Sequence, residues 1–172
     1  MLTAVERVLI LRQIDLLKAA GPRQLLSLAE LLREVEVWTG QVIYQEKDAA
    51  DALYVVVQGR VRLSADGRPL SEVGSGEAFG TWALVDDSER GQRAECIEDG
   101  LLVALDREEF YEFATGDTLL LRQIIHTLAR RLRQLVVERP EEARVEGEGA
   151  QAETSASSSG AGETKEQTGP AG

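Results

Sequence analysis

The sequence has few of the residues that most catalytic and metal-binding chemistries require. It contains one cysteine, Cys96, and one histidine, His126. A single thiol excludes an intramolecular disulfide and a multi-cysteine zinc site, and a single histidine excludes a two-histidine metal site. Cys96 falls in an expected strand, where we predict a buried, unreactive thiol. The sequence therefore gives no indication of a function based on disulfides, on reactive thiols or on such metal sites.

Long apolar runs and an excess of positive charge are also missing. Charged residues interrupt the apolar segments, so none approaches the roughly 20 residues of a membrane-spanning helix. The first residues, Met1–Arg7, lack the basic region of a secretory signal. The formal net charge of −11 repels nucleic-acid phosphates and anionic lipid surfaces. We therefore expect a soluble, cytoplasmic protein with no DNA partner and no membrane partner.

Sequence signatures of catalysis are scarce as well. The chain has no phosphate-binding loop of the Gly-Lys-Ser/Thr type. The adjacent acids Glu108–Glu109 and Glu141–Glu142 are expected to be solvated pairs rather than a catalytic dyad. We therefore expect a protein that is not an enzyme and that requires no cofactor.

The last part of the chain has no aromatic residue. Residues 140–172 are rich in Glu, Gly, Ser and Ala and contain one branched aliphatic residue, Val145. Such a segment buries too little apolar surface to offset the conformational entropy that is lost on ordering. The sequence therefore predicts a disordered acidic tail from Pro140 onward.

Before that tail, the spacing of apolar residues predicts helices at both ends and strands between them. Helical stripes cover residues 5–17 and the segment after Gly21-Pro22. From Val35 onward apolar and polar residues alternate, and glycine turns separate the short runs. Helix returns at Asp106, and the stripe of the last and longest helix consists of Leu120, Leu121, Ile124, Ile125, Leu128, Leu132 and Leu135.

Many short strands with regular glycine turns are typical of a jelly roll or a barrel. Leu53–Val57 and the run around Val61 are predicted as separate strands, as are the runs around Cys96 and Leu101–Leu105. The predicted fold is mainly β with flanking helices: a β jelly-roll (double-stranded β-helix) barrel with N-terminal helices and a long C-terminal helix. Its expected segments are N-terminal helices at 1–34, the β-roll at 35–105, C-terminal helices at 106–139 and the tail at 140–172.

The segment Gly76–Arg90 has the composition of a site for a small phosphate. A glycine lets backbone N–H groups approach an anion closely, and the start of a following helix adds its dipole. The planar guanidinium of Arg90 can hold two phosphate oxygens. The alternative is a surface arginine that pairs with a neighbouring acid, namely Asp86, Asp87 or Glu89. These acids also compete with a phosphate for Arg90.

This segment resembles the phosphate-binding cassette of the cyclic nucleotide-binding domain family, whose members include sensor domains like that of the cyclic AMP receptor protein. The family pattern reads Phe-Gly-Glu-x-Ala-Leu and then Pro-Arg-x-Ala; the residues that match it without a gap are Phe79, Gly80, Ala83, Leu84 and Arg90. The cassette is degenerate at two positions, because Thr81 replaces the family glutamate and Glu89 replaces the proline.

The resemblance extends over roughly residues 5–136. Lys47–Tyr54 is similar to the family signature Gly-Asp-x-x-Asp-x-Leu-Tyr, and Leu105–Phe110 is similar to its Leu-Asp-Arg-x-x-Phe ending. Lys47 replaces the family glycine, so a positive φ at this turn costs about 1 kcal/mol of strain.

The resemblance implies a non-enzymatic regulatory sensor with Arg90 on the phosphate of cyclic AMP or cyclic GMP. The implied ligand-binding residues are Phe79, Gly80, Thr81, Ala83, Leu84, Arg90, Gly91 and Gln92. The family glutamate accepts a bond from the ribose hydroxyl, and its replacement by threonine weakens binding by roughly 10- to 100-fold. We therefore expect weak binding of a cyclic AMP type of nucleotide, or of a related phosphorylated ligand that suits a hydroxyl.

In this family the last long helix covers the base. The resemblance gives this base-capping role to Ile124, Thr127 and Leu128, whereas the apolar residues of the helix otherwise form core or the seam of a homodimer. Trp82 is expected to pack in the core or beneath a lid rather than to line the pocket.

The alternative function is that of a degenerate domain with no small ligand, which serves as a dimerisation or protein-interaction scaffold. Too little ordered chain is expected after residue 136 for a helix-turn-helix domain. We therefore expect a stand-alone domain rather than a complete transcription factor. Its output then passes through a homodimer or through a protein partner that the sequence does not identify.

Overall fold

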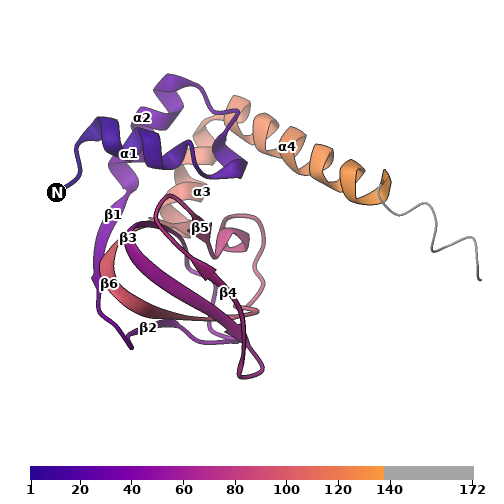
Figure 1. The fold of residues 1–172 in the computed structure, drawn as a ribbon. Helices are drawn as coiled ribbons and strands as arrows, with labels where there is room; N and C mark the ends of the chain where they lie inside the picture. The colour runs from indigo at the N-terminus through magenta and orange to yellow at the C-terminus, as the bar shows by residue number, and fades with distance from the viewer. Residues whose placement is uncertain (138–172) are drawn as a thin grey trace, which may run out of the picture. The chain divides into compact units, whose positions relative to one another are not determined.

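The computed structural model describes residues 1–137 (Figure 1). Its elements, in chain order, are α1 (Ala4–Leu11), the 3₁₀ helix η1 (Asp15–Leu17), α2 (Pro22–Leu31), β1 (Arg33–Val37), β2 (Val42–Tyr44), β3 (Ala52–Ala65), β4 (Arg68–Val73), β5 (Ala78–Phe79), the 3₁₀ helix η2 (Thr81–Leu84), β6 (Arg93–Asp106), α3 (Arg107–Gly116) and α4 (Thr118–Val137). Residues Met1–Arg130 form one compact unit, and a second unit begins at Arg131. The predicted tail at 140–172 lies outside the described residues. Within residues 1–137, no helix combines the length and the apolar character needed to cross a bilayer.

The six strands form one antiparallel sheet. Its path runs β1-β6-β3-β4, with β2 paired to β6 and β5 paired to β3. Helices α1, α2 and α3 gather at one end of this sheet (Figure 1). The mainly β fold class with flanking helices is therefore confirmed. The closed barrel is not: among the described strands, β1 and β4 end the path without pairing with each other.

Strands β3 and β6 are each continuous over 14 residues, where the sequence predicted two shorter strands in each case. The glycines between the runs bend the strands and do not end them. Gly59 has a φ of +92°, and a Cβ added to Gly100 would lie 1.9 Å from the carbonyl oxygen of Gln58. The register between the two strands shifts at this point. The bend curves the sheet, and pairing between the two strands continues on both sides of it.

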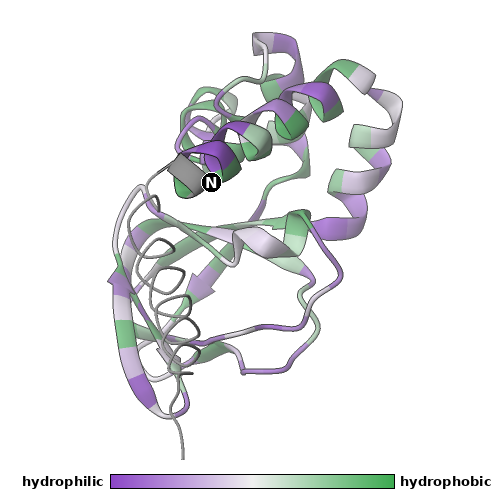
Figure 2. Ribbon diagram, turned by 90° about the vertical axis from the view of Figure 1, so that its right-hand side faces the viewer, coloured by the Kyte–Doolittle hydropathy of each residue, from purple (hydrophilic) through white to green (hydrophobic). Residues whose placement is uncertain are grey.

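Two apolar clusters pack against opposite faces of β3. Leu53 and Val55 belong to the cluster that the helices cover, whereas Tyr54 and Val56 belong to the cluster inside the bend of the sheet. Neighbouring side chains of a strand point to opposite faces, so a strand that is buried on both faces is apolar throughout. The helices in Figure 2 carry both apolar and polar residues along their length, as amphipathic helices do. The candidate site lies at the edge of the inner cluster.

Candidate functional site

The cassette segment begins where β5 ends. Phe79 is buried and stacks on Tyr54, with ring centroids 5.3 Å apart. Gly80 then adopts a left-handed φ of 68° and caps η2. A Cβ at position 80 would lie 2.6 Å from Nη1 of Arg90, so a side chain here would displace the guanidinium. The expected helix after the glycine is a single 3₁₀ turn of four residues, and its dipole is correspondingly small.

Arg90 turns inward, and its side chain is only 3% exposed. Its Nη2 donates to Oδ1 of Asp51 at 2.9 Å and to the carbonyl oxygen of Ala52 at 2.6 Å. Its Nη1 makes a longer contact of 3.4 Å with the carbonyl oxygen of Gly80. The alternative of a surface arginine is therefore wrong, because the described ion pair of Arg90 involves Asp51 and none of the sequence neighbours Asp86, Asp87 and Glu89.

The backbone of Arg90 is held by the turn that precedes β3. Its N–H donates to the carbonyl oxygen of Asp48 at 2.8 Å, and its own carbonyl accepts from the N–H of Lys47 at 2.7 Å. Lys47 has a φ of +69°, which is the left-handed conformation expected at this position. The turn at 47–48 therefore fixes the arginine in place and carries strain to do so.

Two tyrosines lie beneath the guanidinium. Its Cζ is 4.1 Å from the ring centroid of Tyr44 and 5.8 Å from that of Tyr54, within the range of a cation–π interaction. Burial raises the pKa of Tyr44 to about 12, and the charge of Arg90 only partly opposes this shift. Tyr44 is therefore a neutral hydroxyl at physiological pH, and it supports the cation with its ring.

One polar atom of Arg90 has no partner. Its Nε is buried, and no described residue accepts a hydrogen bond from it. Burying a donor without an acceptor costs roughly 1–3 kcal/mol, and more when the group is charged. The three contacts above use three of the five guanidinium N–H groups, so the Nε–H and one N–H of Nη1 have no acceptor among the described residues. These donors are where an incoming acceptor gains most.

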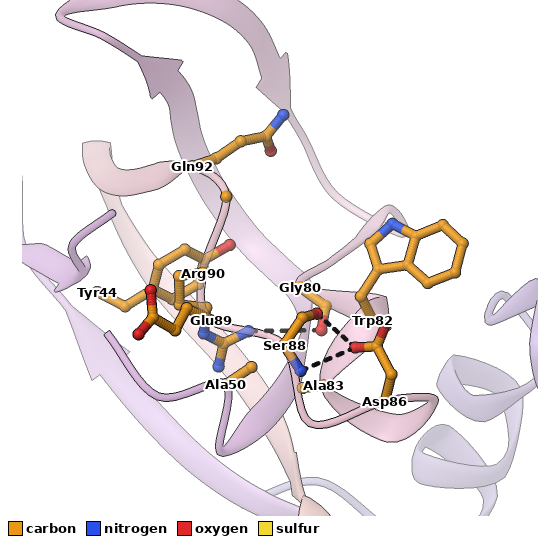
Figure 3. A pocket seen from close by; sticks show the side chains of 11 residues that line it. Tyr44, Ala50, Gly80, Trp82, Ala83, Asp86, Ser88, Glu89, Arg90 and Gln92 are labelled. Carbon is orange, nitrogen blue, oxygen red and sulfur yellow. Dashed lines mark hydrogen bonds between the residues drawn. The ribbon is translucent and has the colours of Figure 1, made fainter. Parts of the chain in front are cut away.

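Arg90 borders a cavity of about 510 Å³ (Figure 3). In this view its guanidinium lies between Tyr44 and Gly80, and Trp82 stands at the rim on the far side of Ser88 and Asp86. The volume falls within the usual range for small-molecule sites. The cavity is lined by Tyr44, Ala50, Gly80, Trp82, Ala83, Asp86, Ser88, Glu89, Arg90, Gly91 and Gln92.

Carboxylates weaken the positive potential of this cavity. Hydrogen bonds from the hydroxyl and the N–H of Ser88 lower the pKa of Asp86, so Asp86 remains ionised on the cavity wall. Glu89 also lines the cavity. Asp87 is bound away from it in an ion pair with Arg107, the first residue of α3. An anionic ligand in this cavity is therefore attracted by the buried cation of Arg90 and repelled by the carboxylates around it.

Five of the eight predicted ligand-binding residues line the cavity: Gly80, Ala83, Arg90, Gly91 and Gln92. The other three lie outside its lining. Phe79 is in the inner cluster, Leu84 is in the cluster beneath the helices, and Thr81 is half-buried at the start of η2. Ligand contacts by all eight stay a prediction, since a lining position shows access and not binding.

The predicted base-capping residues of α4 also lie outside the cavity lining. Ile124 is buried in the cluster beneath the helices, and Leu128 packs against that cluster. The hydroxyl of Thr127 donates to the carbonyl of Gln123 at 3.0 Å. In this arrangement these residues form core, which is the alternative that the apolar stripe allowed.

Several cavity residues escaped the sequence reasoning. Trp82 is 66% exposed and lines the cavity, so the expected core position is wrong. Tyr44 belongs to the alternating region after Val35, and no local pattern indicates that it meets an arginine 46 positions later. Asp86 and Glu89 were expected to compete with a phosphate for Arg90, and both line the cavity, whereas Ser88 was not singled out.

The described residues offer no competing metal or thiol site. They contain no group of three or more His, Cys, Asp or Glu side chains arranged to hold a metal ion. Cys96 is buried, as predicted, and its Sγ contacts the carbonyl oxygen of Glu98 at 3.1 Å. Burial raises the pKa of this thiol, which keeps it protonated and unreactive.

Comparison with known proteins agrees with the fold. Residues 34–117 match the family model of the cyclic nucleotide-binding domain. Residues 34–117 therefore belong to the cyclic nucleotide-binding domain family.

Individual relatives include a receptor protein, an enzyme and a transcriptional regulator. The chain is 37% identical over 104 residues to the cyclic AMP receptor protein of Thermus thermophilus, covering 58% of this chain and 48% of that protein. It is 36% identical over 124 residues to lysophospholipase nte1 of Aspergillus fumigatus, covering 69% of this chain and 8% of the enzyme. The crystal structure of the N-terminal domain of a Streptomyces coelicolor transcriptional regulator superposes with a TM-score of 0.67 at 29% identity, covering 73% of this chain and 94% of that one. The chain thus spans about half of one curated relative and a small part of the other.

Proposed function

We propose that this domain is a non-enzymatic regulatory module that binds a cyclic nucleotide, cyclic AMP or cyclic GMP, with the phosphate on Arg90. The observation that carries the proposal is the buried Nε–H of Arg90, which has no acceptor among the described residues and belongs to a side chain that lines the cavity. A phosphate oxygen supplies an acceptor of the right charge. The 37% identity to a cyclic AMP receptor protein supports the same class of ligand.

The affinity is expected to be modest for two physical reasons. Asp51 already neutralises the guanidinium at 2.9 Å, so a phosphate gains less than it would from an unpaired arginine. Thr81 offers no carboxylate at the position where the family accepts the ribose hydroxyl, and it does not line the cavity. Both effects lower the affinity of the site for a cyclic nucleotide.

The contacts of Asp51 provide a route for output. Its carboxylate binds Arg90, and its carbonyl oxygen accepts from the N–H of Arg107 at 2.8 Å, at the start of α3. A phosphate that weakens the hold of Arg90 on Asp51 therefore changes the forces on the first turn of α3. Binding then biases the helices that follow the sheet, as in a two-state switch.

Calorimetric titration with cyclic AMP and cyclic GMP tests the proposal. Wild-type protein is expected to release or absorb heat at high nucleotide concentration. Arg90→Lys keeps the positive charge but loses Nε and the planar fork, and it should bind at least tenfold more weakly. Thr81→Glu restores the family carboxylate and should tighten binding by roughly 10- to 100-fold if the cassette accepts it.

Arg60→Ala is the matched control, because it removes one exposed arginine that does not line the cavity. It should bind like the wild type. Equal binding by wild type and Arg90→Lys would place the nucleotide elsewhere on the protein. No heat with any variant, Thr81→Glu included, would favour a domain without a small ligand.

The second candidate, a dimerisation scaffold, rests on an apolar stripe of α4. The stripe follows the 4-3-4-3 spacing of a coiled-coil seam and consists of Leu121, Ile125, Leu128, Leu132 and Leu135. Two of these residues, Leu121 and Leu128, also pack against the cluster beneath the helices. Ile125, Leu132 and Leu135 are each more than 60% exposed in the described part of the chain. A homodimer through this helix is compatible with either function. Dimerisation through this helix in a protein that binds no nucleotide would identify the scaffold.

A further inference from the structure

Trp82 is the cavity residue that the fold does not explain. Its neighbours on the same 3₁₀ turn, Ala83 and Leu84, are buried, whereas the indole of Trp82 is 66% exposed. The core therefore gains little from this side chain. The indole nevertheless lines the same cavity as Arg90 and stands clear at its rim (Figure 3).

The backbone beneath the indole is fixed. The carbonyl oxygen of Trp82 accepts from the N–H of Val85 at 2.9 Å and from that of Asp86 at 3.1 Å. Gly80, two residues before, is held in its left-handed conformation next to the guanidinium of Arg90. An aromatic side chain with two rotatable bonds on a fixed turn loses little conformational entropy when a flat ring covers it. The turn thus presents a pre-organised aromatic surface beside an anion site.

We propose that Trp82 is the stacking platform for the aromatic base of the ligand, so that the cassette itself recognises a phosphate linked to a flat ring. The inference rests on the proposed function, because it takes the anion site at Arg90 as given. It assigns base recognition to the turn after Gly80, whereas the resemblance assigned it to α4. It also supplies binding energy at a cassette where Thr81 contributes no carboxylate.

The chemistry of stacking defines which ligands Trp82 distinguishes. Every nucleobase has a π-face, so an indole separates aromatic from non-aromatic ligands but does not separate adenine from guanine. Loss of the platform should therefore weaken cyclic AMP and cyclic GMP alike. A phosphate on a sugar without a base should not be affected, because it meets Arg90 and not the indole.

Two tryptophans in the chain allow a direct optical test. Trp38→Phe leaves Trp82 as the fluorophore, and Trp82→Phe leaves Trp38, which does not line this cavity. Addition of cyclic AMP is expected to quench the emission of Trp38→Phe and to leave the emission of Trp82→Phe unchanged. Phenylalanine keeps an aromatic face, so Trp82→Phe should still bind cyclic AMP in the calorimeter and serves as the conservative variant.

Calorimetry with Trp82→Ala supplies the second readout. Cyclic AMP and cyclic GMP should each bind roughly 10- to 100-fold more weakly to Trp82→Ala than to the wild type. Ribose 5-phosphate should bind both proteins equally. The indole is exposed, so the alanine variant should fold, and circular dichroism checks this.

The outcomes separate this inference from the function on which it rests. Tight cyclic AMP binding by Trp82→Ala, with no quenching in Trp38→Phe, overturns the platform and leaves the Arg90 site in place. An equal loss of ribose 5-phosphate binding in Trp82→Ala also overturns it, since the residue then acts on the phosphate or on the fold. No binding of any nucleotide by the wild type overturns both proposals.

Discussion

At the scale of single residues, the site is organised around one buried charge. The guanidinium of Arg90 is held by a carboxylate, two carbonyl oxygens and the face of Tyr44. A buried charge requires such partners, because desolvation otherwise costs several kcal/mol. Gly80 is part of the same arrangement, since a Cβ there would meet Nη1 at 2.6 Å. The Nε–H and one N–H of Nη1 have no acceptor among the described residues, and the proposed ligand supplies one.

Tyr44 should make the protein sensitive to alkali. Burial raises its pKa from 10.0 to about 12, so between these pH values the folded state keeps a proton that the unfolded state has lost. Stability then falls as the pH rises through this window. Tyr44→Phe removes the titrating hydroxyl and should lose less unfolding free energy between pH 10 and pH 12, as measured by urea denaturation at a series of pH values.

Tyr54 provides the control for this prediction. Burial also raises the pKa of Tyr54. Tyr44→Phe should therefore still lose part of its unfolding free energy as the pH rises above 10, and the double variant Tyr44→Phe/Tyr54→Phe should lose less. Below pH 10 the pH dependence of the single variant should match that of the wild type. Parallel curves for wild type and Tyr44→Phe across the alkaline window would show that the hydroxyl is not buried as described.

The sequence could predict the cassette residues but not what lies around them. The ungapped match from Phe79 to Arg90 placed Arg90 at an anion site, and five predicted residues reach the cavity. The contacts with Tyr44 and Asp51 depend on how the sheet folds, so local spacing does not reveal them. Trp82 was misplaced because apolar residues of a cassette are usually buried, and here the side chain stands at the rim.

At the scale of elements, the sequence predicted the strands better than their ends. Alternation located the runs of β3 and β6, but the glycines within them were interpreted as turns. Gly59 and Gly100 instead bring two backbones so close that a Cβ at Gly100 would lie 1.9 Å from a carbonyl oxygen. A glycine that serves a close approach and one that serves a turn look the same in a sequence. The long bent strands are therefore visible only in three dimensions.

Helix α4 offers a prediction at the same scale. Ile125 is the second position of the 4-3-4-3 stripe and is 65% exposed. A charge at this position would be buried in a dimer without a partner, so Ile125→Glu should convert a concentration-dependent dimer into a monomer. Sedimentation velocity over a range of concentrations measures this change.

His126→Glu is the control for the helix variant. It places the same charge at the next position of α4, which is also exposed but lies outside the stripe. It should dimerise like the wild type. A wild-type protein that remains monomeric at all concentrations contradicts the seam, as does equal dissociation of both variants.

At the scale of the whole molecule, the site works against the charge of the chain. The net charge is −11, and Asp51, Asp86 and Glu89 lie around the buried Arg90. Long-range attraction therefore does not bring an anion to this protein. Binding has to come from short-range contacts, namely the free N–H groups of Arg90, the cavity walls and the exposed indole. The family match accounts for the fold, and these contacts decide whether the domain binds the proposed nucleotide.

The central claim is that an anionic ligand bonds to the buried Nε–H of Arg90. In ¹⁵N-labelled protein this group gives its own resonance, which Arg90→Lys identifies by removing it. Addition of cyclic AMP is predicted to shift the Arg90 Nε–H resonance strongly and to slow its exchange with water, while the Nε–H resonance of exposed Arg60 stays in place. An Arg90 Nε–H resonance that stays in place at nucleotide concentrations that saturate binding would contradict the account. A spectrum that does not change at all, even at high nucleotide concentration, would also contradict it.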